Sequence, residues 1–295
     1  AIIGTSGSGK STLLNIIGGM DQTTDGQYLY DEKNVSKMNS HALHLFRKEY
    51  VSFVFQRFAL LNQYSVYENV EVPLLAKGIE KKERKKKVLS ALMQVGIQDL
   101  YKKKPSELSG GEQQRCAIAR ALVMDTPVVL ADEPTGSLDK NSGIKVMELL
   151  EGLHEQGKTI LLSSHNLAEL SELCTDIGII DAGKMVLSGS MDEIMERIYT
   201  SKQIIISVHD QMEKALAFLK ESPMVRTISI CEKDIMVGFT GDEHRESELL
   251  KQMIEAGIPV RGFMREPGSL ESIFMQITDH NKEKVVLSYE DESGL

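Results

Sequence analysis

The sequence has few cysteines, no long apolar run and no excess of basic residues. Its three cysteines, Cys116, Cys174 and Cys231, are odd in number and far apart. This indicates reduced thiols in a cytosolic protein and disfavours a cysteine metal site. No apolar run approaches the ~20 residues that span a bilayer, and no signal peptide opens the chain. Any membrane association is therefore expected to go through a protein partner.

Length, composition and charge narrow the class further. At 295 residues the chain is long enough for a large domain and a smaller one. Its 41% hydrophobic and 26% charged residues are ordinary for a globular protein, so neither disorder nor a fibrous class is suggested. The formal net charge of −9 predicts no nucleic-acid partner, because neutralising phosphates requires a basic surface.

Apolar segments alternate with helical ones in the first part of the chain. Strands are expected at 26–30, 50–56, 127–132 and 158–163, and a helix at 142–156. This alternation predicts an α/β fold with a mainly parallel sheet covered by helices. Ligands of such folds bind at the carboxyl ends of the strands.

A lysine-rich helical segment interrupts this pattern from about residue 66 to 106 and, with the helix after it, forms an insertion to about residue 123. Its apolar stripe is expected at Leu89, Leu92, Met93 and Val95. The basic runs 81–87 and 102–104 are interpreted as a solvated helix face rather than a site for lipid headgroups.

The pattern changes near residue 190. Strand 203–208, helix 211–221, strands 225–231 and 235–240, helix 243–256 and strand 259–264 follow in that order. The order β-α-β-β-α-β predicts a small α+β, ferredoxin-like accessory domain at 201–278. It closes with an amphipathic helix at 269–277, before a polar tail at 279–295. We expect this domain either to regulate or dock a partner, or merely to pack as a stabilising appendage.

A phosphate-binding loop is predicted near the start of the chain, between an apolar segment and a helix. The glycines let backbone N–H groups surround a phosphate chain, Lys10 meets the outer phosphates, and Ser11 holds Mg²⁺. The string fits GxxxxGK[ST] and consists of Gly4, Thr5, Ser6, Gly7, Ser8, Gly9, Lys10, Ser11 and Thr12.

Two adjacent carboxylates follow the apolar strand 128–131. Asp132, at the strand end, is placed to hold Mg²⁺, while Glu133 points the other way and is a candidate general base for an attacking water. The alternative is that both acids only cap a loop.

A second glycine-containing string runs from Leu108 to Arg115. Ser109 and Glu112 form a capping box for the helix that follows. The bare glycines Gly110 and Gly111 leave backbone N–H groups open, which makes a second anion site at a helix start.

Taken together, these strings resemble the nucleotide-binding subunit of an ATP-binding cassette (ABC) transporter over residues 1–190. The resemblance implies a P-loop NTPase fold of ABC type with a helical subdomain. It adds Gln56 as the link between Mg²⁺ and the membrane partner, the D-loop residue Asp139, and His165 as a γ-phosphate contact. It also implies that Ser109, Gly110 and Gly111 close on the ATP of a second ABC subunit, and we expect the two subunits to form a homodimer.

Two branches of the family are represented. Segment 3–18 and the strings 53–56 and 133–139 resemble the branch of macrolide and lipoprotein exporters. Segments 163–170 and 266–274 resemble the drug- and sodium-exporter branch with its C-terminal accessory domain. Relatives also place strands and an adenine-stacking aromatic residue upstream of the phosphate loop. We therefore expect the sequence to be incomplete at its N-terminus.

The function implied is the ATP-hydrolysing subunit of a bacterial-type ABC exporter, with ATP and Mg²⁺ as cofactors and an integral membrane permease as partner. Its expected place is the cytoplasmic face of the membrane. Two alternatives stay open: an ATP-driven mechanical regulator of a membrane protein that moves no solute, and a soluble ABC ATPase of translation or DNA repair.

Overall fold

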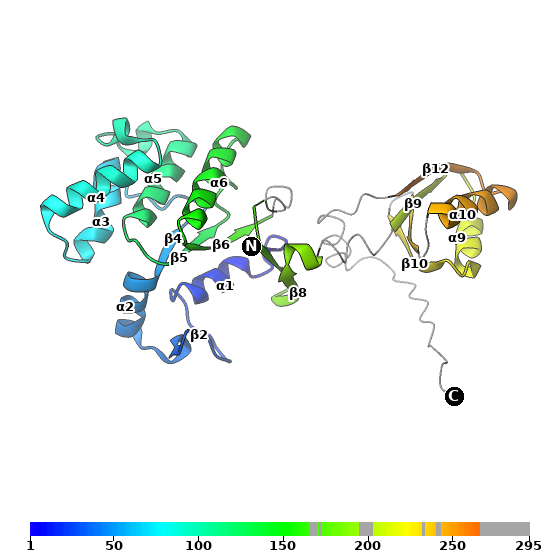
Figure 1. Ribbon diagram of the computed structural model, residues 1–295, viewed down its shortest axis with the longest axis horizontal. Helices are drawn as coiled ribbons and strands as arrows, with labels where there is room; N and C mark the ends of the chain where they lie inside the picture. Colours follow the sequence, from blue (N-terminus) through cyan, green and yellow to red (C-terminus); the bar gives the residue numbers. More distant parts are fainter. Residues whose placement is uncertain (166–169, 171–172, 195–202, 232–233, 240–242, 266–295) are drawn as a thin grey trace. The chain divides into compact units, whose positions relative to one another are not determined.

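The computed structural model describes residues 1–165, 170, 173–194, 203–231, 234–239 and 243–265. The chain divides into two units, Ala1–Ser188 and Gly189–Leu295 (Figure 1). Within the described residues, no helix combines the length and apolar character needed to cross a bilayer.

A six-stranded sheet forms the centre of the first unit, in the order β4-β5-β6-β1-β7-β8. Neighbouring strands from β4 to β7 are paired in parallel, so their carboxyl ends share one edge. The strands are β1 Ile2–Ile3, β4 Val51–Val54, β5 Val128–Asp132, β6 Thr159–Ser164, β7 Asp176–Asp181 and β8 Lys184–Ser190.

Helices cover this sheet. α1 (Lys10–Ile17) packs against β5 and β6, α2 (Ser40–Tyr50) against β4, and α6 (Lys140–Glu155) against β6. The short strands β2 (Leu29–Tyr30) and β3 (Lys33–Asn34) pair with each other. The expected strand 26–30 is thus confined to its last two residues. The expected strand 50–56 starts one residue later, because Tyr50 ends α2.

Three helices form the lobe that the sequence predicts as an insertion: α3 (Val66–Ala76), α4 (Lys81–Gln94) and α5 (Gly110–Leu122). They pack on one another and lie together at one end of the first unit in Figure 1. Short 3-10 turns at Val35–Lys37, Gln98–Leu100 and Pro105–Glu107 complete the connections.

The apolar stripe expected on α4 is partly wrong. Met93 is 67% exposed, while Val88, Ala91, Leu92 and Val95 are buried. The buried positions follow the i, i+3, i+4, i+7 spacing of one helix face. Met93 is one residue past Leu92, which turns its side chain away from that face.

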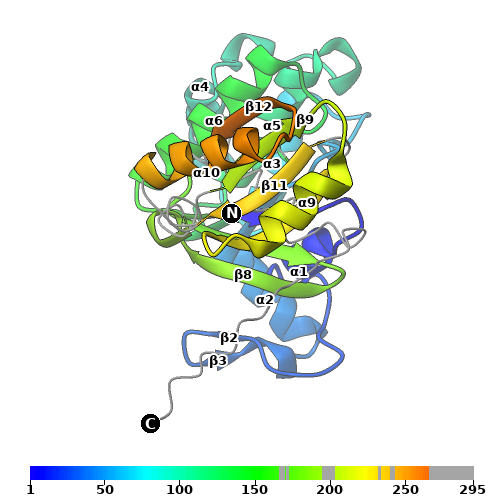
Figure 2. The same cartoon turned by 90° about the vertical axis from the view of Figure 1, so that its right-hand side faces the viewer.

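The second unit has the predicted element order. Its four-stranded sheet runs β10-β11-β9-β12 with antiparallel pairing throughout, and Figure 2 shows α9 and α10 on one face of it. The predicted helix 269–277 and tail 279–295 lie outside the described residues. The elements are β9 Gln203–Val208, α9 Met212–Glu221, β10 Val225–Cys231, β11 Asp234–Phe239, α10 Glu243–Glu255 and β12 Val260–Arg265.

Candidate functional site

The predicted phosphate loop connects β1 to α1. Gly7 and Gly9 have φ angles of 78° and 107°, which L side chains rarely adopt. A Cβ on Gly4 would overlap Ser8 Oγ and the carbonyl oxygen of Ile180. Close approach therefore excludes a side chain at Gly4, and the backbone conformation disfavours one at Gly7 and Gly9.

This loop has the features of an anion site. The Ser8 hydroxyl is buried, and no hydrogen-bond partner contacts its oxygen. α1 begins at Lys10 with no side-chain cap and no acidic residue of its own in the first turn, so the helix supplies no carboxylate to its N-terminal N–H groups and positive dipole end. Ser11 and Thr12 are exposed on that turn. Phosphate oxygens match such donors, and so the residues present fit the nucleotide phosphates.

Lys10 is held by acceptors on two sides. Its Nζ donates to the carbonyl oxygens of Gly4 at 2.8 Å and Thr5 at 3.1 Å, and lies 3.5 Å from Glu133 Oε1. The Lys10 side chain is 6% exposed and that of Glu133 16%. This ion pair is therefore little screened by water.

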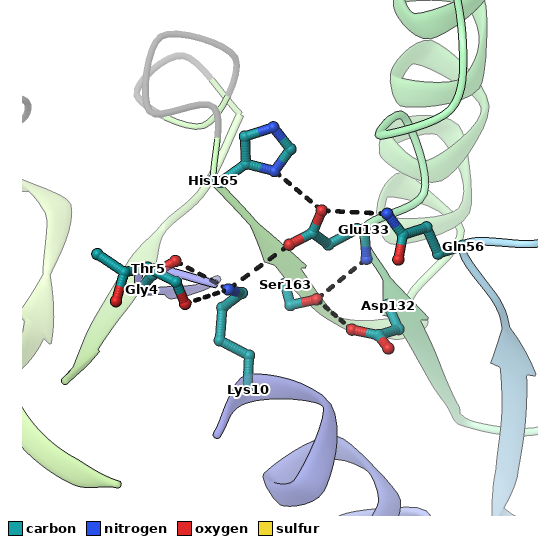
Figure 3. Close-up of polar contacts among 8 residues, drawn as sticks. All are labelled: Gly4, Thr5, Lys10, Gln56, Asp132, Glu133, Ser163 and His165. Atoms are coloured by element: carbon teal, nitrogen blue, oxygen red, sulfur yellow. Dashed lines mark hydrogen bonds and ion pairs between the residues drawn. The ribbon is translucent and has the colours of Figure 1, made fainter. Parts of the chain in front are cut away.

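Three predicted residues, Lys10, Gln56 and His165, contact the Glu133 carboxylate (Figure 3). Besides the Lys10 contact, its Oε2 lies 2.9 Å from His165 Nδ1 and accepts from Gln56 Nε2 at 3.5 Å. Because an ionised carboxylate only accepts, the contact with His165 places a proton on Nδ1. The Glu133 backbone has a φ of 44°, a left-handed conformation that turns its side chain off the line of β5.

Asp132 lies beside this centre but makes a different contact. Its Oδ1 accepts a hydrogen bond of 2.7 Å from Ser163 Oγ, and Ser163 Oγ in turn accepts a hydrogen bond of 3.0 Å from the Glu133 N–H. Ser163 was not among the residues predicted from the sequence. The available signal was its place near the end of the strand 158–163, two residues before His165.

The second predicted anion site starts α5. Ser109 caps the helix, and Glu112 bonds back to the Ser109 N–H and hydroxyl at 2.7 and 2.9 Å. These two bonds, from the Ser109 backbone first and its side chain second, lower the pKa of Glu112. Gly110 approaches Leu138, and a Cβ on Gly111 would meet Ser142 Oγ at 2.7 Å. Gly110 and Gly111 of the predicted signature segment thus lie against the loop before α6 and the first turn of α6.

Asp139 has a capping role in this structure. Its Oδ1 accepts from the Ser142 N–H at 3.1 Å at the start of α6. Hydrogen bonds from the side chain and backbone of Ser142 lower the pKa of Asp139.

Two side chains of α5, the buried Gln114 and the partly buried Arg120, connect this helix to the segments beside the Glu133 centre. Gln114 Nε2 donates to the carbonyl oxygen of Pro134 at 2.8 Å, directly after Glu133. Arg120 donates to the carbonyl oxygens of Phe58 and Ala59, at 2.8 Å for Phe58, shortly after Gln56. α5 therefore contacts the chain directly after Glu133, at Pro134, and the chain shortly after Gln56, at Phe58 and Ala59.

A glycine loop between a parallel strand and a helix, with carboxylates at the end of a neighbouring strand, defines a P-loop nucleotide-binding protein. Residues 1–136 match the family described as ABC transporter. The macrolide export ATP-binding/permease protein MacB 2 of Yersinia pestis is 42% identical over 197 residues, covering 67% of this chain and 29% of that protein.

Two further relatives match more of their own length. An uncharacterized ABC transporter ATP-binding protein of Thermotoga maritima is 47% identical over 171 residues, covering 58% of this chain and 73% of that protein. A solved dimeric ATP-binding cassette, MJ0796, in a post-hydrolysis state bound to ADP and Pi, has 38% identity and a TM-score of 0.60. The match covers 64% of this chain and 84% of the cassette.

This chain belongs to the ABC transporter family, among its ATP-binding proteins. The family and the α/β fold expected from the motifs are confirmed. The chain spans less than a third of the macrolide-export relative, 29% of its length.

Proposed function

We propose that this chain binds and hydrolyses ATP and passes the resulting conformational change to a separate membrane permease, as the ATP-hydrolysing subunit of an exporter. The observation that carries the proposal is the convergence of Lys10, Gln56 and His165 on the Glu133 carboxylate. The relatives named as macrolide export proteins support export. The transported substrate stays open.

In the proposed reaction, Glu133 takes the proton of the water that attacks the terminal phosphate. Lys10 and His165 hold the carboxylate from two sides and fix its direction. The Lys10 ammonium contacts two carbonyl oxygens and the Glu133 carboxylate, all of which are acceptors. Phosphate oxygens of ATP, which are also acceptors, would compete with them for the Lys10 ammonium. A positioned general base contributes about 10²–10⁴ in rate.

Ser11, Gln56 and Asp132 are the proposed Mg²⁺ ligands, and all three offer oxygen atoms, which this hard cation prefers. The ion would supply charge neutralisation for the phosphates. Gln56 Nε2 is used on Glu133, which leaves its amide oxygen as the candidate ligand.

The site is proposed to be completed by a second copy of the chain. The signature residues Ser109, Gly110 and Gly111, with Glu112 closing the capping box, stand at the start of α5, where the two glycines lie against Leu138 and Ser142. The dimeric state of the solved cassette supports this assembly. Ser109→Arg should block closure, because a long cation there would fill the space of the ATP held by the other copy. Sizing in ATP and Mg²⁺ would show a monomer for this variant and a dimer for the wild-type chain.

The proposed place of the chain is the cytoplasmic face of the membrane, bound peripherally to its permease and not to nucleic acid. Purification from membranes in mild detergent tests this partner. An integral membrane protein that co-purifies and raises ATP hydrolysis supports the proposal. An assembly that hydrolyses ATP but moves no solute across vesicles would favour a mechanical regulator.

ATP-dependent phosphate release tests the proposed activity. We expect the wild-type chain to release phosphate from Mg·ATP, and Lys10→Ala to lose release on the order of 10²-fold or more, since the outer phosphates lose their cation. Lys37→Ala is a matched control, because Lys37 is an exposed lysine in a turn of the same unit. Failure of the wild-type chain to release phosphate would contradict the proposed activity.

A further inference from the structure

Ser163 joins the two carboxylate residues of the site through a single hydroxyl group. It lies on β6, directly opposite Asp132 in the parallel pairing of β5 and β6. Its side chain is fully buried, and Figure 3 shows it between Asp132 and the backbone of Glu133. Ser163 opens the segment 163–170 used for the family resemblance, but it is not among the site residues predicted from the sequence.

The two hydrogen bonds use both capacities of the hydroxyl. Ser163 Oγ donates to Asp132 Oδ1 at 2.7 Å, since the carboxylate only accepts, and accepts from the Glu133 N–H at 3.0 Å. The Glu133 N–H also points at the Ser163 carbonyl oxygen at 3.1 Å. One residue thus restricts the Asp132 side chain and supports the left-handed backbone of Glu133.

We propose that Ser163 is a positioning residue for both acids: it fixes the Asp132 carboxylate for the metal and the Glu133 backbone for the base. The expected effect on hydrolysis rests on the proposed function. The expected effect on metal affinity rests on the hydrogen bond between Ser163 and Asp132. Ligating carboxylates are commonly oriented by such outer hydrogen bonds, whose loss typically costs about 10–100-fold in metal affinity or activity.

The variants separate the hydroxyl from the volume of the side chain. Ser163→Thr and Ser163→Val have nearly the same shape and differ in the hydroxyl. Ser163→Ala removes the hydroxyl with the smallest change in volume. Ser52→Ala is the matched control, because Ser52 is a buried serine on β4 whose Oγ donates to the Ala121 carbonyl oxygen at 2.9 Å, away from the acids.

Two measurements are made on the full chain. The first is the affinity of Mn²⁺, followed by electron paramagnetic resonance, for the complex with a non-hydrolysable ATP analogue. The second is phosphate release from Mg·ATP. We expect Ser163→Ala and Ser163→Val to lose about tenfold in both, Ser163→Thr to stay near the wild-type chain, and nucleotide binding in EDTA to be unchanged by the Ser163→Ala and Ser163→Val substitutions.

Equal Mn²⁺ affinities for Ser163→Thr and Ser163→Val would overturn the inference, as would equal affinities for Ser163→Ala and Ser52→Ala. A wild-type chain that binds Mn²⁺ with the analogue but releases no phosphate would contradict the proposed function. In that case the Mn²⁺ affinities would still decide the role of Ser163.

Discussion

Replacing Arg120 with lysine tests how α5 holds the segment that follows Gln56. The guanidinium bonds to the carbonyl oxygens of Phe58 and Ala59. Both residues have left-handed backbones, with φ angles of 55° and 50°, a conformation that costs a non-glycine residue about 1–3 kcal/mol. We therefore expect the backbone at Phe58 and Ala59 to leave this strained conformation when the hydrogen bonds from Arg120 are removed.

The expected magnitude follows from the number of hydrogen bonds lost. The Arg120 side chain is partly buried, and this burial lowers its pKa. A hydrogen bond to a charged group contributes about 1.5–3 kcal/mol. A lysine has no planar fork and retains one of the two carbonyl contacts. Arg120→Lys should therefore lower the free energy of opening this segment by about 1.5–3 kcal/mol.

Amide hydrogen exchange followed by mass spectrometry is the suitable assay, because it reports segment 57–60 and α5 separately from the second unit. Arg57→Lys is the matched control, since Arg57 is exposed in the same segment. Adding Ala59→Gly to Arg120→Lys should recover about 1 kcal/mol, because glycine adopts positive φ without strain. Equal exchange in Arg120→Lys and Arg57→Lys would refute the reasoning.

Three further outcomes are expected. Glu112→Gln should destabilise α5 by about 0.5–1 kcal/mol at neutral pH. The folded-state pKa of Glu112 is lowered, so this difference in stability should fade as the pH falls from the ordinary glutamate pKa of about 4.3 through the lowered pKa. Urea titrations at several pH values measure it. Burial raises the pKa of Cys116 to about 12, so native-state alkylation at pH 8 should modify the partly exposed Cys174 before Cys116; faster modification of Cys116 would be the contrary result. Leu92→Ala should lower the free energy of unfolding in urea by about 2–5 kcal/mol, and Met93→Ala, at an exposed position, by less than about 0.5 kcal/mol. Equal losses would indicate that Met93 is buried, as the sequence predicted.

Local patterns in the sequence were sufficient for much of the fold. The glycine spacing before Lys10 placed the start of α1, and the pairing of Ser109 with Glu112 placed the start of α5. These signals are contained within a few consecutive residues, where the backbone conformation depends on local hydrogen bonds and glycine content. Local patterns were less reliable for burial, as Met93 shows, because which face of α4 is buried depends on the positions of α3 and α5.

Contacts between distant segments were beyond the reach of one sequence. Ser163 meets Asp132 because β6 pairs with β5 in one particular register, and a shift of one residue would turn its side chain to the other face of the sheet. Arg120 reaches Phe58 and Ala59 because α5 packs near the segment after Gln56. Such contacts follow from tertiary packing, and no spacing in the chain encodes them.

The role of Glu133 as the base is tested most directly by measuring ATP turnover and ATP affinity together for Glu133→Gln, with Glu151→Gln, an exposed substitution on α6, as the control. The amide keeps the size of the side chain but cannot take a proton from water. We predict that Glu133→Gln binds ATP as the wild-type chain does while its turnover falls about 10²–10⁴-fold. Turnover equal to that of Glu151→Gln would contradict the account.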